Sequence, residues 1–224
     1  MIICIADLLR ADHVAGLRAQ LAHTTFVDGR ATAGWHAQPI KHNRQADRGA
    51  PGVGRLQGQV REALESNPLF QLAARPRALS PILFSRYEPG MEYGPHVDDA
   101  LMGAGERRLR TDIALTLFLS DPETYRGGSL VIESTGGQQS YKLDAGSLVL
   151  YPATTLHRVE PVTRGTRLAA VAWVQSLVRD PARRELLFDL DTVRRTLYER
   201  EGKSTEFDLL SKSVANLMRM WADV

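Results

Sequence analysis

Two histidines and an aspartate stand out because their types and spacing could bind a metal ion. The stretch from Tyr87 to Asp99 reads YEPGMEYGPHVDD, so His96 and Asp98 lie two residues apart, just after a Gly-Pro pair. In an extended segment such residues point to the same side, and Asp99 would point away from them. His157 opens a later strand-like run, HRVEPV. Two imidazoles and one carboxylate suit non-haem Fe(II), and the same set could hold Zn²⁺ with a water as fourth ligand.

A single arginine near this set indicates what could bind beside the metal. Arg167 follows His157 by ten residues, in the run GTRLAAVAW. If residues 163–165 form a turn, Arg167 lies on a strand that returns beside His157. A guanidinium in an apolar strand needs an anion, and its planar fork matches a carboxylate. The pattern favours a dicarboxylic keto acid that chelates the metal at one end and pairs with Arg167 at the other. The alternative is an exposed arginine beside a turn.

Short β-rich runs from about residue 77 onward would have to position these groups. They are separated by turn-forming stretches such as Gly-Gly, Asp-Ala-Gly and Thr-Arg-Gly, with no helical pattern between them. Seven or eight short strands of this kind favour an antiparallel sandwich or barrel.

Helical spacing appears on both sides of the β-rich region. Apolar residues three or four apart predict helices over residues 11–22 and 53–65, and Asn67-Pro68 ends the second. The region between them, residues 28–52, is rich in Gly, Ala and polar residues and is typical of a long loop, a candidate substrate lid. After residue 180, one helix is predicted with an apolar stripe, and another over residues 207–221. The stripe comprises Leu186, Leu190, Val193 and Leu197.

Composition limits the class of protein. The 224 residues include 43% hydrophobic and 24% charged residues with a net charge of +2, which fits a globular protein with a mixed surface. This charge is too small and too dispersed to indicate nucleic-acid binding. Cys4 is the one cysteine, so an intrachain disulfide and a Cys-rich zinc site are excluded. No apolar run is long enough to span a bilayer and no cleavable leader is seen, so we expect a soluble, cytoplasmic protein without a membrane partner.

Longer stretches around these residues resemble the Fe(II)/2-oxoglutarate-dependent dioxygenases. The closer likeness is to the bacterial PKHD-type hydroxylases, relatives of prolyl 4-hydroxylase associated with iron uptake. The resemblance runs along nearly the whole chain, through FVDGRATAG at 26–34, RYEPGMEYGPHVD at 86–98, TLFLSDPETYRGGSLVIE at 116–133, LYPATTLHRVEPVTRG at 150–165 and VQSLVRD at 174–180.

The resemblance implies a fold and a set of cofactors. The fold would be mainly β with flanking helices: a double-stranded β-helix (jelly-roll) core with N-terminal helices packed on it. Residues 1–178 would form the dioxygenase domain, with its β core over residues 77–178, and residues 179–224 a C-terminal helical extension. Fe(II), 2-oxoglutarate and dioxygen would be used, with ascorbate as a candidate reductant. The activity would be hydroxylation coupled to decarboxylation of 2-oxoglutarate to succinate and CO2.

The resemblance also assigns residues. Iron would bind at His96, Asp98 and His157, and 2-oxoglutarate at Arg167, with Tyr87 as a further hydrogen-bond partner. The family's K-N-N-x-Q stretch corresponds here to KHNRQ at 41–45, in which His42 is the departure. We assign Lys41, Asn43 and Trp35 to the binding of a small-molecule or peptide substrate.

Three other functions share parts of this pattern. A sensor of iron or 2-oxoglutarate without turnover would use the same residues. A nucleic-acid demethylase of the same superfamily would carry a second arginine six residues after Arg167, where this chain has Trp173. A zinc hydrolase would leave Arg167 unexplained. The sequence leaves open whether the protein is a monomer or a homodimer.

Overall fold

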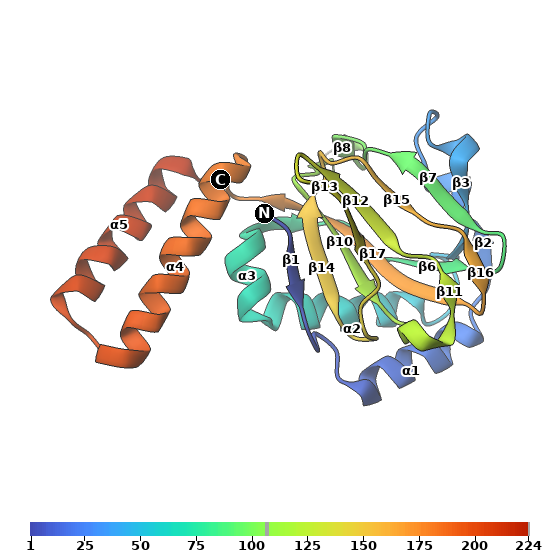
Figure 1. The fold of residues 1–224 in the computed structure, drawn as a ribbon, viewed down its shortest axis with the longest axis horizontal. Helices are drawn as coiled ribbons and strands as arrows, with labels where there is room; N and C mark the ends of the chain where they lie inside the picture. Colours follow the sequence, from blue (N-terminus) through green and yellow to red (C-terminus); the bar gives the residue numbers. More distant parts are fainter. Residues whose placement is uncertain (106–107, 224) are drawn as a thin grey trace.

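The computed structural model describes residues 1–105 and 108–223, which form two facing antiparallel sheets with flanking helices (Figure 1). The larger sheet has eight strands in the order β1-β14-β10-β17-β6-β4-β2, with β5 paired to β17, and the smaller has five in the order β13-β12-β15-β7-β3. The mainly β, jelly-roll class expected from the sequence is confirmed.

The strands have the following bounds. In the larger sheet they are β1 (Ile3–Ile5), β2 (Phe26–Asp28), β4 (Arg44–Ala46), β5 (Pro76–Leu79), β6 (Leu83–Tyr87), β10 (Ile113–Phe118), β14 (Leu148–Pro152) and β17 (Arg167–Ser176). In the smaller sheet they are β3 (Lys41–His42), β7 (Glu92–His96), β12 (Leu130–Ser134), β13 (Gly137–Tyr141) and β15 (His157–Val159). Two short ribbons pair β8 (Leu101–Met102) with β9 (Leu109–Arg110), and β11 (Arg126–Gly127) with β16 (Val162–Arg164).

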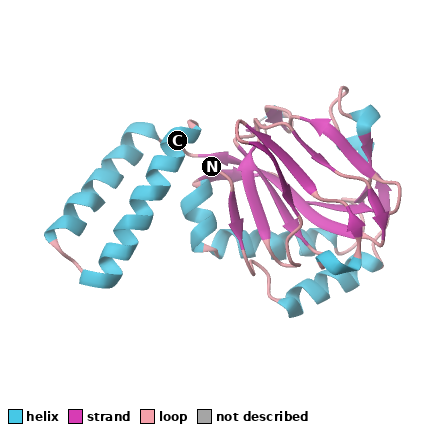
Figure 2. Ribbon diagram, viewed as in Figure 1, coloured by secondary structure: helices cyan, strands magenta, loops and turns pink. Residues whose placement is uncertain are grey.

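Helices cover the outer face of the larger sheet (Figures 1 and 2). Leu56, Val60 and Leu64 share one buried face of α2, which explains why the predicted helix forms there. The Asn67-Pro68 pair ends α2 as predicted, but it also starts another helix, because the Asn67 side chain accepts from the Phe70 N–H at 2.9 Å. The helices are α1 (Ala11–Ala22), α2 (Val53–Ser66), α3 (Pro68–Ala74), α4 (Pro181–Glu201) and α5 (Thr205–Trp221), and the 3-10 turns are η1 (Gly29–Thr32), η2 (Gln38–Ile40) and η4 (Pro122–Thr124).

The region 28–52, which we predicted to be a long loop, contributes strands to both sheets instead. β3 pairs with β7, and β4 pairs with β6 and β2. Lys41, Asn43 and Gln45 are buried while His42 and Arg44 are exposed, so the segment alternates as a strand does. Hydrophobic periodicity cannot detect such a strand, because both of its faces are polar.

The C-terminal helices α4 and α5 pack against each other as a hairpin to one side of the sheets (Figure 1). Both helices were expected. Of the apolar stripe on α4, Leu186 is 46% exposed and Val193 is 57% exposed, while Leu190 packs against the apolar cluster between α4 and α5. The buried face includes Leu187 and the charged residue Asp191, which pairs with Arg75 at the end of α3. Because this buried contact between α3 and α4 is an ion pair, the pattern of apolar residues in the sequence does not reveal it.

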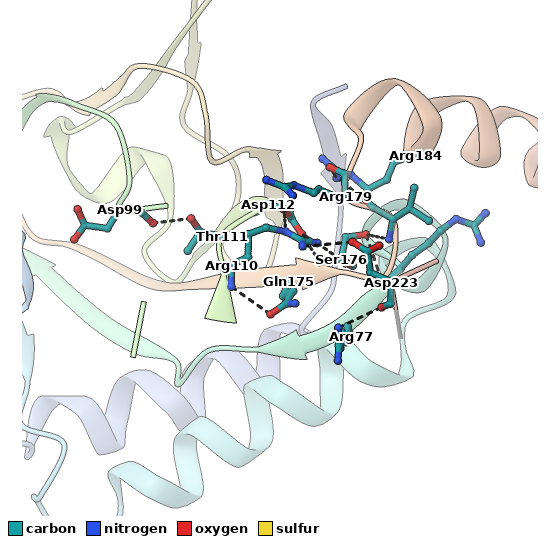
Figure 3. A network of polar contacts seen from close by, with 12 residues as sticks. Arg77, Asp99, Arg110, Thr111, Asp112, Gln175, Ser176, Arg179, Arg184 and Asp223 are labelled. Atoms are coloured by element: carbon teal, nitrogen blue, oxygen red, sulfur yellow. Dashed lines mark hydrogen bonds and ion pairs between the residues drawn. The ribbon is translucent and has the colours of Figure 1, made fainter. Parts of the chain in front are cut away.

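A polar network fastens the end of this hairpin to the larger sheet (Figure 3). The buried carboxylate of Asp112 accepts from Arg110 Nε at 2.7 Å and from the Ser176 N–H at 2.8 Å. Arg110 also reaches Asp223 at 3.4 Å, and the Asp223 N–H donates to the Leu177 carbonyl at 2.7 Å. Asp223 therefore lies beside the start of β10. Among the described residues, no helix has the length and apolar character that crossing a membrane requires.

Candidate metal centre

His96, Asp98 and His157 meet at one point of the smaller sheet. β7 and β15 are neighbouring strands, and His96 and His157 are register partners whose ring centroids lie 4.2 Å apart. Asp98 follows the end of β7, and its Oδ2 lies 3.8 Å from His157 Nε2. One ligand atom from each residue lies within 4.8 Å of the others. The three side chains could hold one ion, although they come from positions sixty residues apart.

Each histidine is oriented by a backbone carbonyl close to it in sequence. His96 Nδ1 lies 2.8 Å from the Gly94 carbonyl, and His157 Nδ1 lies 3.0 Å from that of Thr155. A carbonyl oxygen can only accept, so Nδ1 carries the proton in both rings and Nε2 is left with its lone pair. Tyr93 stacks on His96 with ring centroids 3.6 Å apart. Both imidazoles are therefore held in the tautomer and orientation that a metal ligand needs.

The electrostatics of the three groups fit a bound cation. Burial lowers the pKa of His96 to about 3, with His157 adding to the effect, so this imidazole is neutral at physiological pH. Burial also raises the pKa of Asp98, against the lowering influence of His157. Asp98 Oδ2 is buried and has no hydrogen-bond partner among the described residues. A buried carboxylate oxygen without a donor is costly unless a cation binds it, so the residues present fit a metal ion.

Arg167 faces the centre from the larger sheet. It starts β17, where it is the register partner of Tyr87 on β6, and it lines the same cavity as the three metal-site residues. The sequence prediction that its strand returns beside His157 is wrong, because the chain crosses between the sheets after β16 and β17 pairs with β6 and β10. One sheet therefore supplies the imidazoles, and the opposite sheet supplies the guanidinium.

The Arg167 side chain is 1% exposed and its Nε has no hydrogen-bond partner. The ion pairs within the described part of the chain do not include it. Its guanidinium carbon lies 5.2 Å from the centroid of the Tyr87 ring and 5.5 Å from that of Phe118. Aromatic faces stabilise a guanidinium but do not neutralise it, so the site calls for an anionic ligand.

Two further residues support Arg167 and were missed from the sequence. The Tyr125 hydroxyl is buried without a partner, and its pKa is raised by burial but lowered by the nearby Arg167. Gly128 has a φ of +66°, and a Cβ there would lie 3.1 Å from Arg167 Cδ. We had given the Gly127-Gly128 pair a turn role only. The positive φ and the close approach of Val162 Cγ2 at 2.9 Å, together with the arginine stem, favour glycine at the second position, and no local signal could have shown these contacts.

The residues assigned to substrate separate into two groups. Lys41 and Asn43 line the cavity, with the Lys41 ammonium 2.9 Å from the Thr32 hydroxyl. Both polar atoms of the Asn43 amide are buried and have no hydrogen-bond partner among the described residues. Trp35 is 86% exposed and lies outside the cavity lining, with its ring 5.6 Å from that of His36. His42, the departure from the family pattern, is on the exposed face of β3 near Glu92, so it leaves the cavity unchanged.

Asp99 was predicted to point away from the metal site, and the group of possible metal ligands among the described residues does not include it. Asp99 lines the same cavity, and its carboxylate oxygens would lie 3.0 Å from a Cβ at Gly34. β7 ends at His96, so the alternation of a strand no longer applies to the residues after it. The chain here is held by Thr111, whose hydroxyl donates to the Asp99 carbonyl at 2.6 Å and whose N–H donates to the Ala100 carbonyl at 3.0 Å (Figure 3).

We expect Thr111→Val to weaken metal binding roughly three- to tenfold, because it removes the hydrogen bond that fixes the backbone next to Asp98 while keeping the side-chain shape. The measurement is the affinity for Fe(II) or Co(II) by anaerobic titration. Thr24→Val is the matched control, since it deletes a similar bond, to the Gln20 carbonyl at 3.0 Å, at the end of α1. Equal weakening in both variants would show a general loss of stability rather than a local role.

Comparison with known proteins agrees with this geometry. Residues 82–175 match the model of the 2OG-Fe(II) oxygenase superfamily, and residues 181–223 match that of the PKHD-type hydroxylase C-terminal domain. A PKHD-type hydroxylase of Synechococcus elongatus is 59% identical over 223 residues, which cover 100% of both chains.

Solved structures share the fold at low sequence identity. A 2OG-Fe(II) oxygenase-family oxidoreductase from Burkholderia pseudomallei matches with a TM-score of 0.56 and 13% identity, over 78% of this chain and 84% of that one. A prolyl-4-hydroxylase from Pseudomonas putida matches with a TM-score of 0.51 and 23% identity, over 78% of this chain and 92% of that one.

Proposed function

Since the chain belongs to the PKHD-type hydroxylases of the 2OG-Fe(II) oxygenase superfamily, we propose that His96, Asp98 and His157 bind its Fe(II) and that Arg167 binds its 2-oxoglutarate. The protein is thus a dioxygenase that hydroxylates a substrate. One observation supports the residue assignment: among the described residues, a buried carboxylate oxygen of Asp98 and the buried Nε of Arg167 have no hydrogen-bond partner, and both residues line one cavity.

The proposed roles follow from the positions of the side chains. Arg167 pairs with the distal carboxylate of 2-oxoglutarate, and Tyr87, its register partner, donates its hydroxyl to the same ligand. The two imidazoles present Nε2 to the metal because their Nδ1 protons are held by carbonyls. Both walls are buried, which keeps water away from the reacting groups. Bound iron supplies the oxygen chemistry that couples decarboxylation of 2-oxoglutarate to hydroxylation.

Turnover without the primary substrate tests this proposal. Anaerobic reconstitution with Fe(II), followed by oxygen and 2-oxoglutarate, should release succinate and CO2 slowly, and candidate substrates should increase the rate. Ascorbate, which we propose as the reductant, should prolong the activity. A protein that binds both iron and 2-oxoglutarate but forms no succinate under any of these conditions would be a sensor rather than an enzyme.

Three broader features complete the proposal. We assign residues 1–178 to the oxygenase domain and residues 179–224 to an extension, a division supported by the separate apolar cluster between α4 and α5. A small molecule or a peptide is the proposed substrate class, and Lys41 and Asn43 are the proposed contacts. A cytoplasmic location is consistent with the single, unpaired Cys4.

A further inference from the structure

Lys41 places a second buried cation in the cavity. The residue is 5% exposed and is the register partner of Tyr93, so β3 holds its side chain along the strand that ends at His96. Its ammonium lies 5.0 Å from the centroid of the Tyr93 ring, and the same ring stacks on His96. One aromatic ring therefore separates the Lys41 ammonium from a proposed iron ligand.

The protein provides little that neutralises this charge. Among the described residues, the hydrogen-bond partner of the ammonium is the neutral Thr32 hydroxyl, which lies 2.7 Å from Gln45 Oε1 and can donate to it. None of the ion pairs in that part of the chain includes Lys41. Burial lowers the pKa of Lys41 to about 8, so the amine still carries its proton at pH 7. Asp98 is the strongest stabilising charge, and it belongs to the proposed metal set.

A purely structural lysine would have a carboxylate partner or would extend its ammonium into water. Lys41 does neither. The cavity's other cation, Arg167, is already assigned to 2-oxoglutarate, and Asp99 is exposed at the rim against Gly34. The Lys41 ammonium donates to the hydroxyl of Thr32, which also lines the cavity.

A second observation on the same strand also points to a ligand. Asn43 lies two residues from Lys41, on the same buried face, and its amide nitrogen and oxygen have no hydrogen-bond partner within 3.5 Å among the described residues. The amide is close enough to Tyr87 to lower the pKa of its hydroxyl, against the raising effect of burial. A Cβ at Gly29 would lie 1.8 Å from Asn43 Oδ1, so glycine at that position makes room for the amide. Neighbouring ammonium and amide groups form a set that can donate to one planar, singly charged group. A phosphate would call for more positive charge than one ammonium.

We propose that Lys41 binds a carboxylate of the primary substrate, which makes the substrate an organic monoanion held close to the metal centre. This inference rests on the proposed function, because it takes the metal to be at His96 and the cosubstrate to be at Arg167. Asn43 donates to the same carboxylate or to an adjacent carbonyl. The carbon that reacts is then near the charged end of the substrate, since a single ring separates Lys41 from His96.

Acetate and acetamide, its uncharged isostere, test this proposal, because both are small enough to enter the cavity whatever the size of the true substrate. The protein is loaded with Mn(II) and saturated with 2-oxoglutarate, and the paramagnetic relaxation of the probe's methyl protons is measured. We expect acetate to be relaxed several-fold more strongly than acetamide. In Lys41→Met and Lys41→Gln the acetate effect should fall at least about tenfold, and Lys41→Arg should retain much of it. Lys212→Met, which removes an exposed ammonium on α5, is the matched control and should match the wild type.

Each other outcome overturns the proposal. Equal relaxation in the wild type and Lys41→Met would place acetate directly on the metal or at another cation. Relaxation by acetate no stronger than by acetamide in the wild type would mean that no anion site exists. A large loss of 2-oxoglutarate affinity in Lys41→Gln would assign Lys41 to the cosubstrate. Failure of the proposed function is distinguishable, because the wild-type protein would then bind neither Mn(II) nor 2-oxoglutarate at the loading step.

Discussion

His157→Ala is expected to lose stoichiometric Fe(II) binding, with an affinity more than about a hundredfold below that of the wild type. The substitution leaves one imidazole and one carboxylate to bind the metal. The loss of affinity should therefore exceed the 10–100-fold losses that are usual when a residue that only supports a ligand is replaced. An anaerobic titration against a chelator of known affinity measures the change. Circular dichroism of the metal-free protein should be unchanged, since the ring's Nδ1 contact is local, to the Thr155 carbonyl at 3.0 Å.

The matched control is His42→Ala. This histidine belongs to the same sheet, on β3 next to β7, but it is exposed on the opposite face near Glu92. It should bind iron as the wild type does, and its melting temperature should rise with added metal by the same amount. Undiminished iron binding by His157→Ala would remove His157 from the metal set and leave the orphaned oxygen of Asp98 without an explanation.

Arg167→Met is expected to lose affinity for 2-oxoglutarate without losing folding stability. Loss of a charge-assisted pair to a carboxylate in a buried site costs about 2–5 kcal/mol, or from about thirtyfold to more than a thousandfold in affinity. Calorimetric titration of 2-oxoglutarate into the iron-loaded protein measures this loss. The metal-free variant should be as stable as the wild type or more stable, because methionine replaces a buried guanidinium that has no ion pair with any described residue. Arg167→Lys should rescue affinity only in part, since it restores charge without the fork.

Arg158→Met serves as the control for Arg167→Met. Arg158 lies on β15 next to His157, but it points outward and pairs with Glu133 and Glu160. Its loss should leave 2-oxoglutarate affinity unchanged. An Arg167→Met protein that is strongly destabilised yet binds 2-oxoglutarate normally would identify Arg167 as a structural residue and would refute its assignment to the cosubstrate.

The sequence identified those elements whose own side chains carry the periodicity of their structure. α1 runs over Ala11–Ala22 as predicted, and α2 ends within one residue of the expected position, because each buries apolar residues three and four apart. The apolar runs of β10 and β14 are strands that are buried on both faces, and β17 alternates between buried and half-buried residues. The H-x-D pair could also be found from local spacing, since His96 and Asp98 lie two residues apart at the end of one strand.

Tertiary structure decided what depends on residues distant in the chain. The KHNRQ segment is a strand whose polar face is buried in a cavity, so its burial depends on neighbours and not on its own hydrophobicity. Asp191 is buried on α4, where Arg75 at the end of α3 pairs with it, and the spacing of apolar residues could not indicate this contact.

The candidate site likewise combines features that the sequence indicated with features that only the fold determined. The identities of His96, Asp98, His157 and Arg167 were accessible from residue type and spacing, since few side chains can bind a metal or clamp a carboxylate. That the imidazoles and the guanidinium come from opposite sheets, and that Lys41 shares their cavity, was not accessible. Strand pairing is set by backbone hydrogen bonds and by the burial of whole faces, which involve every strand at once. The sequence thus determined the chemistry available, and the pairing of the strands determined which groups face one another.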